Sequence, residues 1–436
     1  MKDRKRDRSR KRLPKRVALF VVAVLLGGLL AVPAAVTAMA GTPEACSAAD
    51  ADIYRPPDRA TATPGAVVAC RRVDALPMVG NGTPFDAWKV QYGSTDGRSR
   101  PVSVVGTVVV PKEPWKGAGE RPLVGFVPGT LGIGPQCAFS KQLAGQYQDA
   151  YEGPNISALL KAGYAVAATD GAGYMDGQVH PYVNGVEAGH AALDMARAAL
   201  RMPGSGVAAG APVGFWGYSE GGSGSLWAAQ VARSYAPELH VVGVASGGIP
   251  ADLKEVSHGL DGGFFAGFLI DAVIGLSVTH PDMPFQDLLD DGGHKAVKDA
   301  ESLCAIGTVT RFAGARIEQY TKDHLTLDQM YALHGPDGTT WSDVAAGNKL
   351  GVGLGTPGSG ARYEVGFPVL QYRGVLDEVI PAKTADGVRQ AYCAAGITTQ
   401  WKPYVGDHLT GDFQAVGDTV AWLGDRFEGK ETKGNC

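Results

Sequence analysis

The chain has 436 residues, of which 45% are hydrophobic, and its formal net charge is −4. This length and composition allow one large domain with insertions, or two to three smaller domains, around a sizeable core. The slightly acidic balance argues against a nucleic-acid partner.

The first 40 residues have the three parts of a secretory signal peptide. A strongly basic start at residues 1–16 precedes an uncharged apolar run at 17–32, and the small-residue site Ala38-Met39-Ala40 follows. We expect cleavage before Gly41 and a secreted, extracellular protein. The alternative is an uncleaved N-terminal anchor that retains the protein at the cell envelope.

All cysteines lie beyond this site. They are Cys46, Cys70, Cys137, Cys304, Cys393 and Cys436. An even number of cysteines in an exported protein favours disulfides, here three, and six cysteines allow 15 connectivities. None has the C-x-x-C spacing, so metal and redox sites have little support.

Residues 41–83 are rich in Ala, Pro and Asp, and we expect them to form an N-terminal extension over the surface of the fold. Alternation of apolar and polar residues at 86–92 and 102–110 predicts an antiparallel hairpin. Strands and helices then alternate. The expected strands are 123–127, 164–169, 212–216 and 241–245, and the expected helices are 156–162, 185–201 and 225–233. This alternation predicts a mostly parallel, doubly wound sheet with helices on both faces.

From about residue 248 to 366 the alternation stops and helical composition takes over, which predicts an inserted cap. The last expected strands are 368–373 and 398–405, and the last expected helices are 384–395 and 413–427. A hairpin leading into a doubly wound sheet is the layout of an α/β-hydrolase. We therefore assign the core to residues 84–247 and 367–436, and the cap to residues 248–366.

The run V-G-F-W-G-Y-S-E-G-G at 213–222 is an apolar strand that breaks into a G-x-S-x-G turn. Such a turn is the nucleophile elbow, where a strained strand-to-helix connection raises a serine above the sheet. In a chain with 61 glycines the pattern alone is weak, so the strand before it and the helix after it carry the argument. We predict that Ser219 is the nucleophile, the alternative being a Gly-rich turn with an incidental serine.

A serine hydroxyl needs an imidazole to take its proton and a carboxylate to orient that imidazole. In α/β-hydrolases these follow in the order Ser, Asp or Glu, His, each after a late strand. Asp377 and His408 meet this requirement. Glu378 is the main rival of Asp377, a surface imidazole is the alternative for His408, and Asp407 is expected to be a solvated loop charge.

Acyl transfer also needs two N–H donors for the developing oxyanion. The first is the backbone N–H of Glu220, which follows the nucleophile. We expect the second from the loop at 128–132, where two glycines allow close approach to a substrate, and Thr130 is the preferred donor. The alternative is a Gly-rich connection without a catalytic role.

Several motifs together resemble the secretory lipases of the fungal lipase A type and their bacterial relatives, over nearly the whole mature chain. They are Pro128-Gly129-Thr130, Cys137-Ala138-Phe139-Ser140, Ala168-Thr169-Asp170, His180-Pro181-Tyr182, Gly217-Tyr218-Ser219-Glu220-Gly221-Gly222, Tyr235-Ala236-Pro237-Glu238-Leu239, Asp377-Glu378 and His408-Leu409-Thr410. The resemblance implies hydrolysis of acylglycerol esters, a helical cap over the site, and no metal or organic cofactor. It also implies disulfides between Cys137 and Cys304 and between Cys393 and Cys436, which leaves Cys46 for Cys70.

The chain departs from this family at three places. Relatives often have His where Pro128 stands, Pro where Phe139 stands, and a D-Y-x-G-L-G run where this chain has Asp170-Gly171-Ala172-Gly173-Tyr174. These positions surround the acyl and oxyanion region, so they bear on substrate range more than on reaction type.

The cap segment at 259–270 is strongly apolar and has glycine hinges. One interpretation is a lid that makes transient contact with a lipid interface, and the other is the buried face of a cap helix. An acyl pocket lined by Phe264, Phe265 and Phe268 is compatible with both.

The favoured function is a secreted lipase or carboxylesterase that acts on an ester or lipid substrate through an acyl-enzyme. One alternative is a cell-envelope acyltransferase that uses the same three residues. The other is a catalytically silent hydrolase fold that acts as a binding protein. Acyl chain length depends on the shape of the pocket within the cap.

Overall fold

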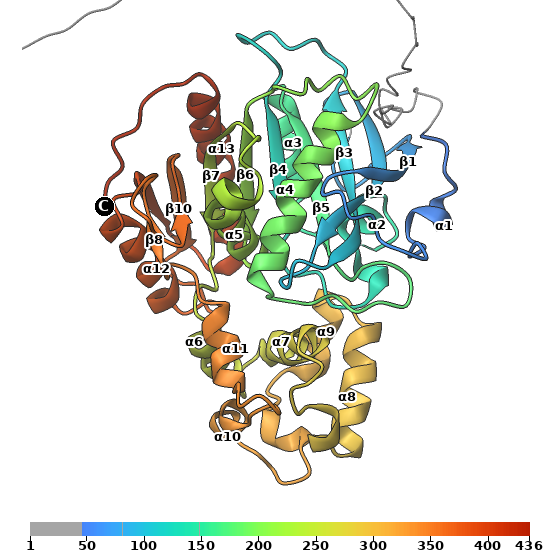
Figure 1. Cartoon of the computed structure of the whole chain (residues 1–436), viewed down its shortest axis with the longest axis vertical. Coiled ribbons are helices and arrows are strands. Elements are labelled where there is room, and N and C mark those ends of the chain that lie inside the picture. Colours follow the sequence, from blue (N-terminus) through green and yellow to red (C-terminus); the bar gives the residue numbers. More distant parts are fainter. Residues whose placement is uncertain (1–45, 81, 148) are drawn as a thin grey trace, which may run out of the picture. The chain divides into compact units, whose positions relative to one another are not determined.

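The computed structural model describes residues 46–80, 82–147 and 149–436, so the expected signal peptide lies outside the described residues. A nine-stranded sheet with the order β1-β2-β3-β5-β4-β6-β7-β10-β11 runs through the described chain (Figure 1). Its strands are β1 (Val67–Val73), β2 (Phe85–Thr95), β3 (Pro101–Pro111), β4 (Leu123–Val127), β5 (Ala165–Gly171), β6 (Val213–Tyr218), β7 (Val241–Gly247), β10 (Val369–Gly374) and β11 (Thr399–Tyr404). The first strands pair antiparallel as far as β5, and β5 to β11 are parallel. The predicted α/β fold with a mostly parallel sheet is confirmed.

The edge strand β1 differs from the expectation that residues 41–83 only lie over the surface. It pairs antiparallel with β2, with Val73 opposite Ala87 and Val67 opposite Tyr92. Cys70 is the one buried residue of this strand. Because its other side chains stay partly or fully exposed, the strand needs no apolar alternation, and residues 67–73 show no periodic pattern that would predict it.

Helices cover both faces of the sheet. On one face lie α4 (Gly185–Arg201), α5 (Glu220–Tyr235) and α12 (Ala382–Ala394). On the other lie α2 (Phe139–Leu143), α3 (Gly153–Lys161) and α13 (His408–Phe427), and the short α1 (Asp50–Ile53) packs near β1 and β2. Strands β4 and β6 are buried along their whole length, as expected for uninterrupted apolar strands of a sheet that is covered on both faces.

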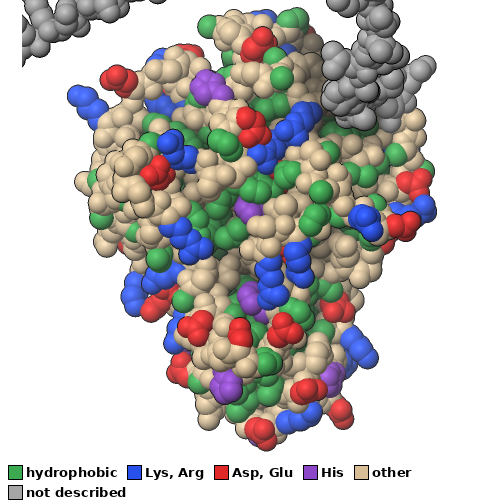
Figure 2. Space-filling view, in the orientation of Figure 1, with side chains coloured by type: hydrophobic (Ala, Val, Ile, Leu, Met, Phe, Trp, Pro, Cys, Tyr) green, Lys and Arg blue, Asp and Glu red, His purple; other side chains and the backbone are tan. Residues whose placement is uncertain are grey.

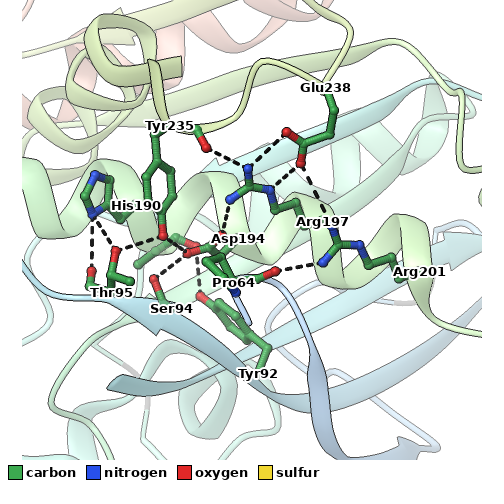
Figure 3. Close-up of polar contacts among 11 residues, drawn as sticks. Pro64, Tyr92, Ser94, Thr95, His190, Asp194, Arg197, Arg201, Tyr235 and Glu238 are labelled. Carbon is green, nitrogen blue, oxygen red and sulfur yellow. Dashed lines mark hydrogen bonds and ion pairs between the residues drawn. The ribbon is translucent and has the colours of Figure 1, made fainter. Parts of the chain in front are cut away.

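A buried polar network ties α4 to α5 and β2 (Figure 3). Asp194 Oδ2 accepts hydrogen bonds from Ser94 Oγ and Tyr235 OH, both at 2.7 Å, and its Oδ1 accepts one from Arg197 Nη1 at 2.7 Å. The Arg197 guanidinium also donates to Glu238 Oε1 at 2.6 Å. Both oxygens of the buried Asp194 are therefore paired. The motif that contains Tyr235 and Glu238 thus stabilises the packing of α4 and α5 and is not part of the elbow.

A cap of helices follows β7 and lies below the sheet in Figure 1. It comprises α6 (Leu253–Leu260), α7 (Ala266–Thr279), α8 (Asp291–Ser302), α9 (Ala305–Phe312), α10 (Leu327–Ala332), α11 (Trp341–Gly347) and the 3₁₀ turns η3 (Gln286–Leu288) and η4 (Ile317–Tyr320). Its buried apolar side chains form a cluster of their own, which Val379 and Ile380 of the core join. No helix of the described residues is long and apolar enough to cross a membrane.

The last part of the expected insertion packs with the core instead of the cap. Leu350 and Tyr363 belong to the same buried cluster as α4 and α5. The Tyr363 ring meets Trp227 of α5 edge-on, with the ring centroids 5.7 Å apart. A separate short pair of strands, β8 (Leu354–Gly355) and β9 (Tyr363–Glu364), forms in this segment. The helical part of the insertion therefore ends near Gly347, not at residue 366.

The six cysteines form disulfides Cys46–Cys70, Cys137–Cys304 and Cys393–Cys436, the pairings that the family resemblance implies. Cys137 lies in η2 (Pro135–Cys137), in the core, and Cys304 is the N-cap of α9. This bond therefore joins the core to the cap across 167 residues of sequence.

Candidate functional site

Ser219 lies in a strained turn between β6 and α5. Its φ is 58°, in the left-handed region that residues with a side chain rarely adopt. A Cβ atom on Gly221 would lie 2.0 Å from Val127 O, and one on Gly217 would lie 2.1 Å from Gly221 O. Only glycine fits at these two positions, so the sequence pattern G-x-S-x-G follows from the geometry of the turn.

The structure brings Ser219, His408 and Asp377 together, although they are far apart in sequence. His408 Nε2 lies 2.9 Å from Ser219 Oγ, and His408 Nδ1 lies 2.8 Å from Asp377 Oδ2. The other oxygen, Asp377 Oδ1, accepts hydrogen bonds from the N–H groups of Val379 and Ile380 at 3.0 and 2.8 Å. Because these contacts hold the carboxylate in place, the imidazole is oriented with its Nδ1–H toward Asp377 and its free lone pair toward the serine.

The residues next to this chain of hydrogen bonds have separate contacts. Glu378 Oε2 accepts from the backbone N–H of His408 at 3.0 Å, so the expected rival of Asp377 contacts the histidine backbone and not its ring. His408 was expected in a loop, but it is the first residue of α13. Asp407 is the N-cap of that helix and accepts from Thr410 N at 2.8 Å, so it has a capping role beyond that of a solvated loop charge.

The two expected oxyanion donors come from different segments, the elbow itself and the loop that follows β4. Glu220 is the first residue of α5, where a helix leaves its N–H groups without partners inside the helix. Thr130 follows Gly129, whose N–H donates to both oxygens of Glu152 at 2.8 and 3.0 Å. No acceptor for the N–H of Thr130 occurs among the residues that the structure describes. The Thr130 hydroxyl is 2.8 Å from Tyr182 OH.

An apolar cavity extends from Ser219 into the cap. Its walls come from the core segment before α4 and from α6, α7, α10 and α11, and they include Tyr182, Leu253, Val256, Leu260, Phe268, Leu269, Leu276, Met330 and Trp341. Walls of this kind suit an acyl chain or another apolar group. Figure 2 shows acidic and basic side chains interspersed over the viewed surface, in keeping with the small net charge.

Of the three phenylalanines expected to line an acyl pocket, Phe268 alone lies in this wall. Phe264 is 65% exposed, and Phe265 is the N-cap of α7. The expectation for Phe264 and Phe265 is therefore not met, because both precede the first turn of α7 and lie outside the cavity. The apolar segment at 259–270 divides between the end of α6, a turn and the start of α7.

The sequence matches the secretory lipase family over residues 141–435. The chain belongs to the secretory lipase family. It is 29% identical to a probable inactive lipase of Mycobacterium tuberculosis, over 85% of this chain and 80% of that protein. It is also 29% identical to a secreted triacylglycerol lipase of Malassezia globosa, over 88% of this chain and 80% of that protein.

Among solved structures, the chain is similar to Candida antarctica lipase A in its closed state. The TM-score is 0.74 at 25% sequence identity, over 88% of this chain and 87% of that chain. A rice cell wall degrading esterase from Xanthomonas oryzae has a TM-score of 0.65 at 16% identity, over 85% of this chain and all of that chain, and shows the fold alone.

The sequence analysis did not identify the groups that surround the loop at 128–132. Glu152, whose carboxyl group accepts from Gly129, stands in a segment without a distinctive pattern. His180 and Tyr182 belong to a motif that supported the resemblance, yet they were given no role. His180 Nε2 lies 2.8 Å from Glu220 Oε1, and Tyr182 reaches Thr130. The H-P-Y motif is thus the one signal in the sequence that pointed toward these contacts.

Proposed function

We propose that this protein is an exported lipase or carboxylesterase that hydrolyses carboxylic esters, acylglycerols among them, through an acyl-enzyme on Ser219. The observation that carries the proposal is the hydrogen-bonded chain from Ser219 Oγ through His408 to Asp377, with spacings of 2.9 and 2.8 Å. Ser219 also lines an apolar cavity, where an acyl group can pack beside the serine.

In the proposed mechanism His408 takes the proton of Ser219 as Oγ attacks the carbonyl carbon of the ester. Asp377 stabilises the resulting imidazolium, and the N–H groups of Glu220 and Thr130 bind the oxyanion of the tetrahedral intermediate. His408 then gives its proton to the leaving alcohol. Water attacks the acyl-enzyme with His408 as the base, the carboxylic acid leaves, and Ser219 regains its proton.

The similarity to a probable inactive lipase makes a catalytically silent hydrolase fold the first rival. A fluorophosphonate probe separates the two, because it reacts covalently with an activated serine. We expect the wild type to be labelled and Ser219→Ala to be unlabelled. Ser223→Ala is the matched control, since Ser223 is equally buried one turn along α5 and makes no contact with His408, and it should be labelled like the wild type. Equal labelling of wild type and Ser219→Ala would refute the nucleophile.

A panel of p-nitrophenyl esters from short to long acyl chains would then define the substrate, and failure on every ester would refute the esterase activity. Acyl transfer to an alcohol in the cell envelope uses the same three residues. Product analysis in the presence of competing alcohols distinguishes it, since a hydrolase releases mainly free acid.

Apolar side chains next to the catalytic loops support contact with a lipid surface during turnover. Leu376 precedes Asp377 and is 67% exposed, and Leu409 and Phe413 near His408 are also exposed. Together with Phe264 of the cap, they give the protein apolar groups on both core and cap. The family and the three disulfides fit an extracellular protein.

A further inference from the structure

His180 and Glu220 form a buried pair beside the elbow. His180 Nε2 lies 2.8 Å from Glu220 Oε1, and His180 Nδ1 lies 2.7 Å from the carbonyl oxygen of Ala172. The two side chains are only 9% and 13% exposed. The His180 ring also stacks on Tyr174, with the centroids 4.5 Å apart. The mechanism above uses neither side chain.

The contacts of His180 define its charge. A carbonyl oxygen can only accept a hydrogen bond, so Nδ1 must carry a proton, and the carboxylate oxygen requires a second proton on Nε2. Burial lowers the pKa of the His180 imidazole, but the charge and hydrogen bond of Glu220, the contact with Ala172 and the more distant Glu187 raise that pKa above its ordinary value. Both ring nitrogens thus face acceptors, an arrangement that suits a protonated ring and an ion pair with Glu220.

The other ionisable groups near Glu220 do not neutralise its negative charge. Glu152 and Asp271 are both fully buried and within electrostatic range of Glu220. Burial, with repulsion from neighbouring carboxylates, raises the pKa of both well above the ordinary value, which favours their neutral forms. Tyr174 and Tyr182 also face Glu220, and burial raises their pKa in the same way. Of these groups only His180 offers a positive charge.

The position of Glu220 creates a conflict for the proposed reaction. Its backbone N–H is an expected oxyanion donor, while its side chain carries a negative charge on the same residue. That side chain lies in a small cavity together with His180 and with Pro128, Gly129 and Leu131 of the loop that carries Thr130. An unbalanced carboxylate there would repel the negative charge that develops on the substrate.

We propose that His180 is a positioning residue whose imidazolium holds the Glu220 side chain beneath the oxyanion loop and cancels its charge, so that the two N–H donors can stabilise the oxyanion. Tyr182, two residues along the same segment, contacts the Thr130 hydroxyl at 2.8 Å. One short segment thus touches both residues that supply the donors. This inference rests on the proposed function.

The test is the order of activities in three variants. In His180→Gln the carboxylate of Glu220 loses its counter-charge, and we expect kcat for a p-nitrophenyl ester to fall about 30-fold while KM stays within about twofold. Glu220→Gln removes the charge itself and keeps an acceptor for His180, so its kcat should fall less than that of His180→Gln. The double variant should recover to the level of Glu220→Gln.

Recovery of kcat in the double variant distinguishes charge compensation from a merely structural role. If His180 only maintained packing, a second substitution would not restore kcat. The inhibition constant of a trifluoromethyl ketone, which forms an oxyanion on the serine, should rise in His180→Gln by the same factor as kcat falls. In the wild type kcat should decline at alkaline pH as His180 loses its proton, and this decline should be absent in Glu220→Gln.

Glu238→Gln is the matched control, since it removes the carboxylate of another ion pair beyond the opposite end of α5, and its kcat should equal that of the wild type. A double variant as slow as His180→Gln, or an unchanged kcat in His180→Gln, would overturn the inference while Ser219 labelling still supports the proposed function. Absence of both labelling and hydrolysis in the wild type would overturn the proposed function, and this inference with it.

Discussion

Two buried aspartates, one in the core and one in the cap, have opposite surroundings. Both oxygens of Asp194 in α4 are hydrogen-bonded, and Arg197 supplies a counter-charge. Asp271 in α7 is equally inaccessible, yet neither of its oxygens has a partner among the described residues. Burial and repulsion by Glu220 raise the pKa of Asp271 well above its ordinary value.

Close packing against the core explains why Asp271 is enclosed. Gly275, one turn along α7, is so near the core that a Cβ atom there would lie 2.4 Å from Tyr182 N. Gly267, one turn before Asp271, packs equally tightly against Thr308 of α9. A carboxyl group between these two contacts has no access to water. The buried charge of the core is therefore compensated by its partners, whereas the buried carboxyl of the cap has no compensating contact among the described residues.

The same substitution at the two positions should have opposite effects, and the larger effect is expected in the core. Asp194→Asn removes the charge that faces Arg197 and one acceptor of the network, so we expect the free energy of unfolding to fall by about 3 kcal/mol. Urea unfolding followed by circular dichroism measures this loss. A change below the error of the measurement would mean that the network contributes nothing to stability.

Asp271→Asn should stabilise the protein at neutral pH, by about 1–3 kcal/mol. Asp271 binds its proton more tightly in the folded than in the unfolded protein. Stability from this proton is therefore complete below the unfolded pKa of about 4 and is lost as the pH rises toward the folded value. The variant cannot ionise, so its advantage over the wild type should be present at pH 7 and nearly absent at pH 4. Unfolding curves at both pH values test this, and a destabilised variant at pH 7 would contradict the neutral, unpartnered state of Asp271.

The smallest effect is expected at Glu238, at the solvent-exposed edge of the hydrogen-bond network around Asp194. Glu238 pairs with Arg197 but is half-exposed, and exposed ion pairs contribute little. Glu238→Gln should lower the free energy of unfolding by less than about 1 kcal/mol. Urea unfolding measures this change. If Glu238→Gln lowered the free energy of unfolding as much as Asp194→Asn, the difference in burial between the two carboxylates would not determine their contributions to stability.

The sequence was most informative where function and topology require particular residues in order. The elbow needs glycine on both sides of Ser219, and Asp377 and His408 each follow a late strand, so all three could be named before their contacts were known. These three residues meet because parallel strands end at the same edge of the sheet. The position of each residue along the chain was therefore enough to predict that the three side chains meet.

Burial in the cap could not be inferred in the same way. Asp271 is an acidic residue in an otherwise apolar helix, and local sequence places such a residue on the solvated side of the helix. Its enclosure depends on how closely α7 approaches Tyr182 and α9, which only the packed structure fixes. The prediction that Phe264 and Phe265 line the cavity was wrong for a related reason, since the turn before α7 directs them outside it. Likewise, β1 shows little apolar alternation because it is an edge strand.

The Cys137–Cys304 disulfide limits how far the cap can move from the core. While the bond is intact, the start of α9 cannot separate from the loop region that follows β4. The helices that line the apolar cavity, α6, α7, α10 and α11, do not carry this bond, so we expect any widening of the cavity to occur there. The covalent link thus divides the cap into a tethered part at α9 and a part without a disulfide at α6, α10 and α11.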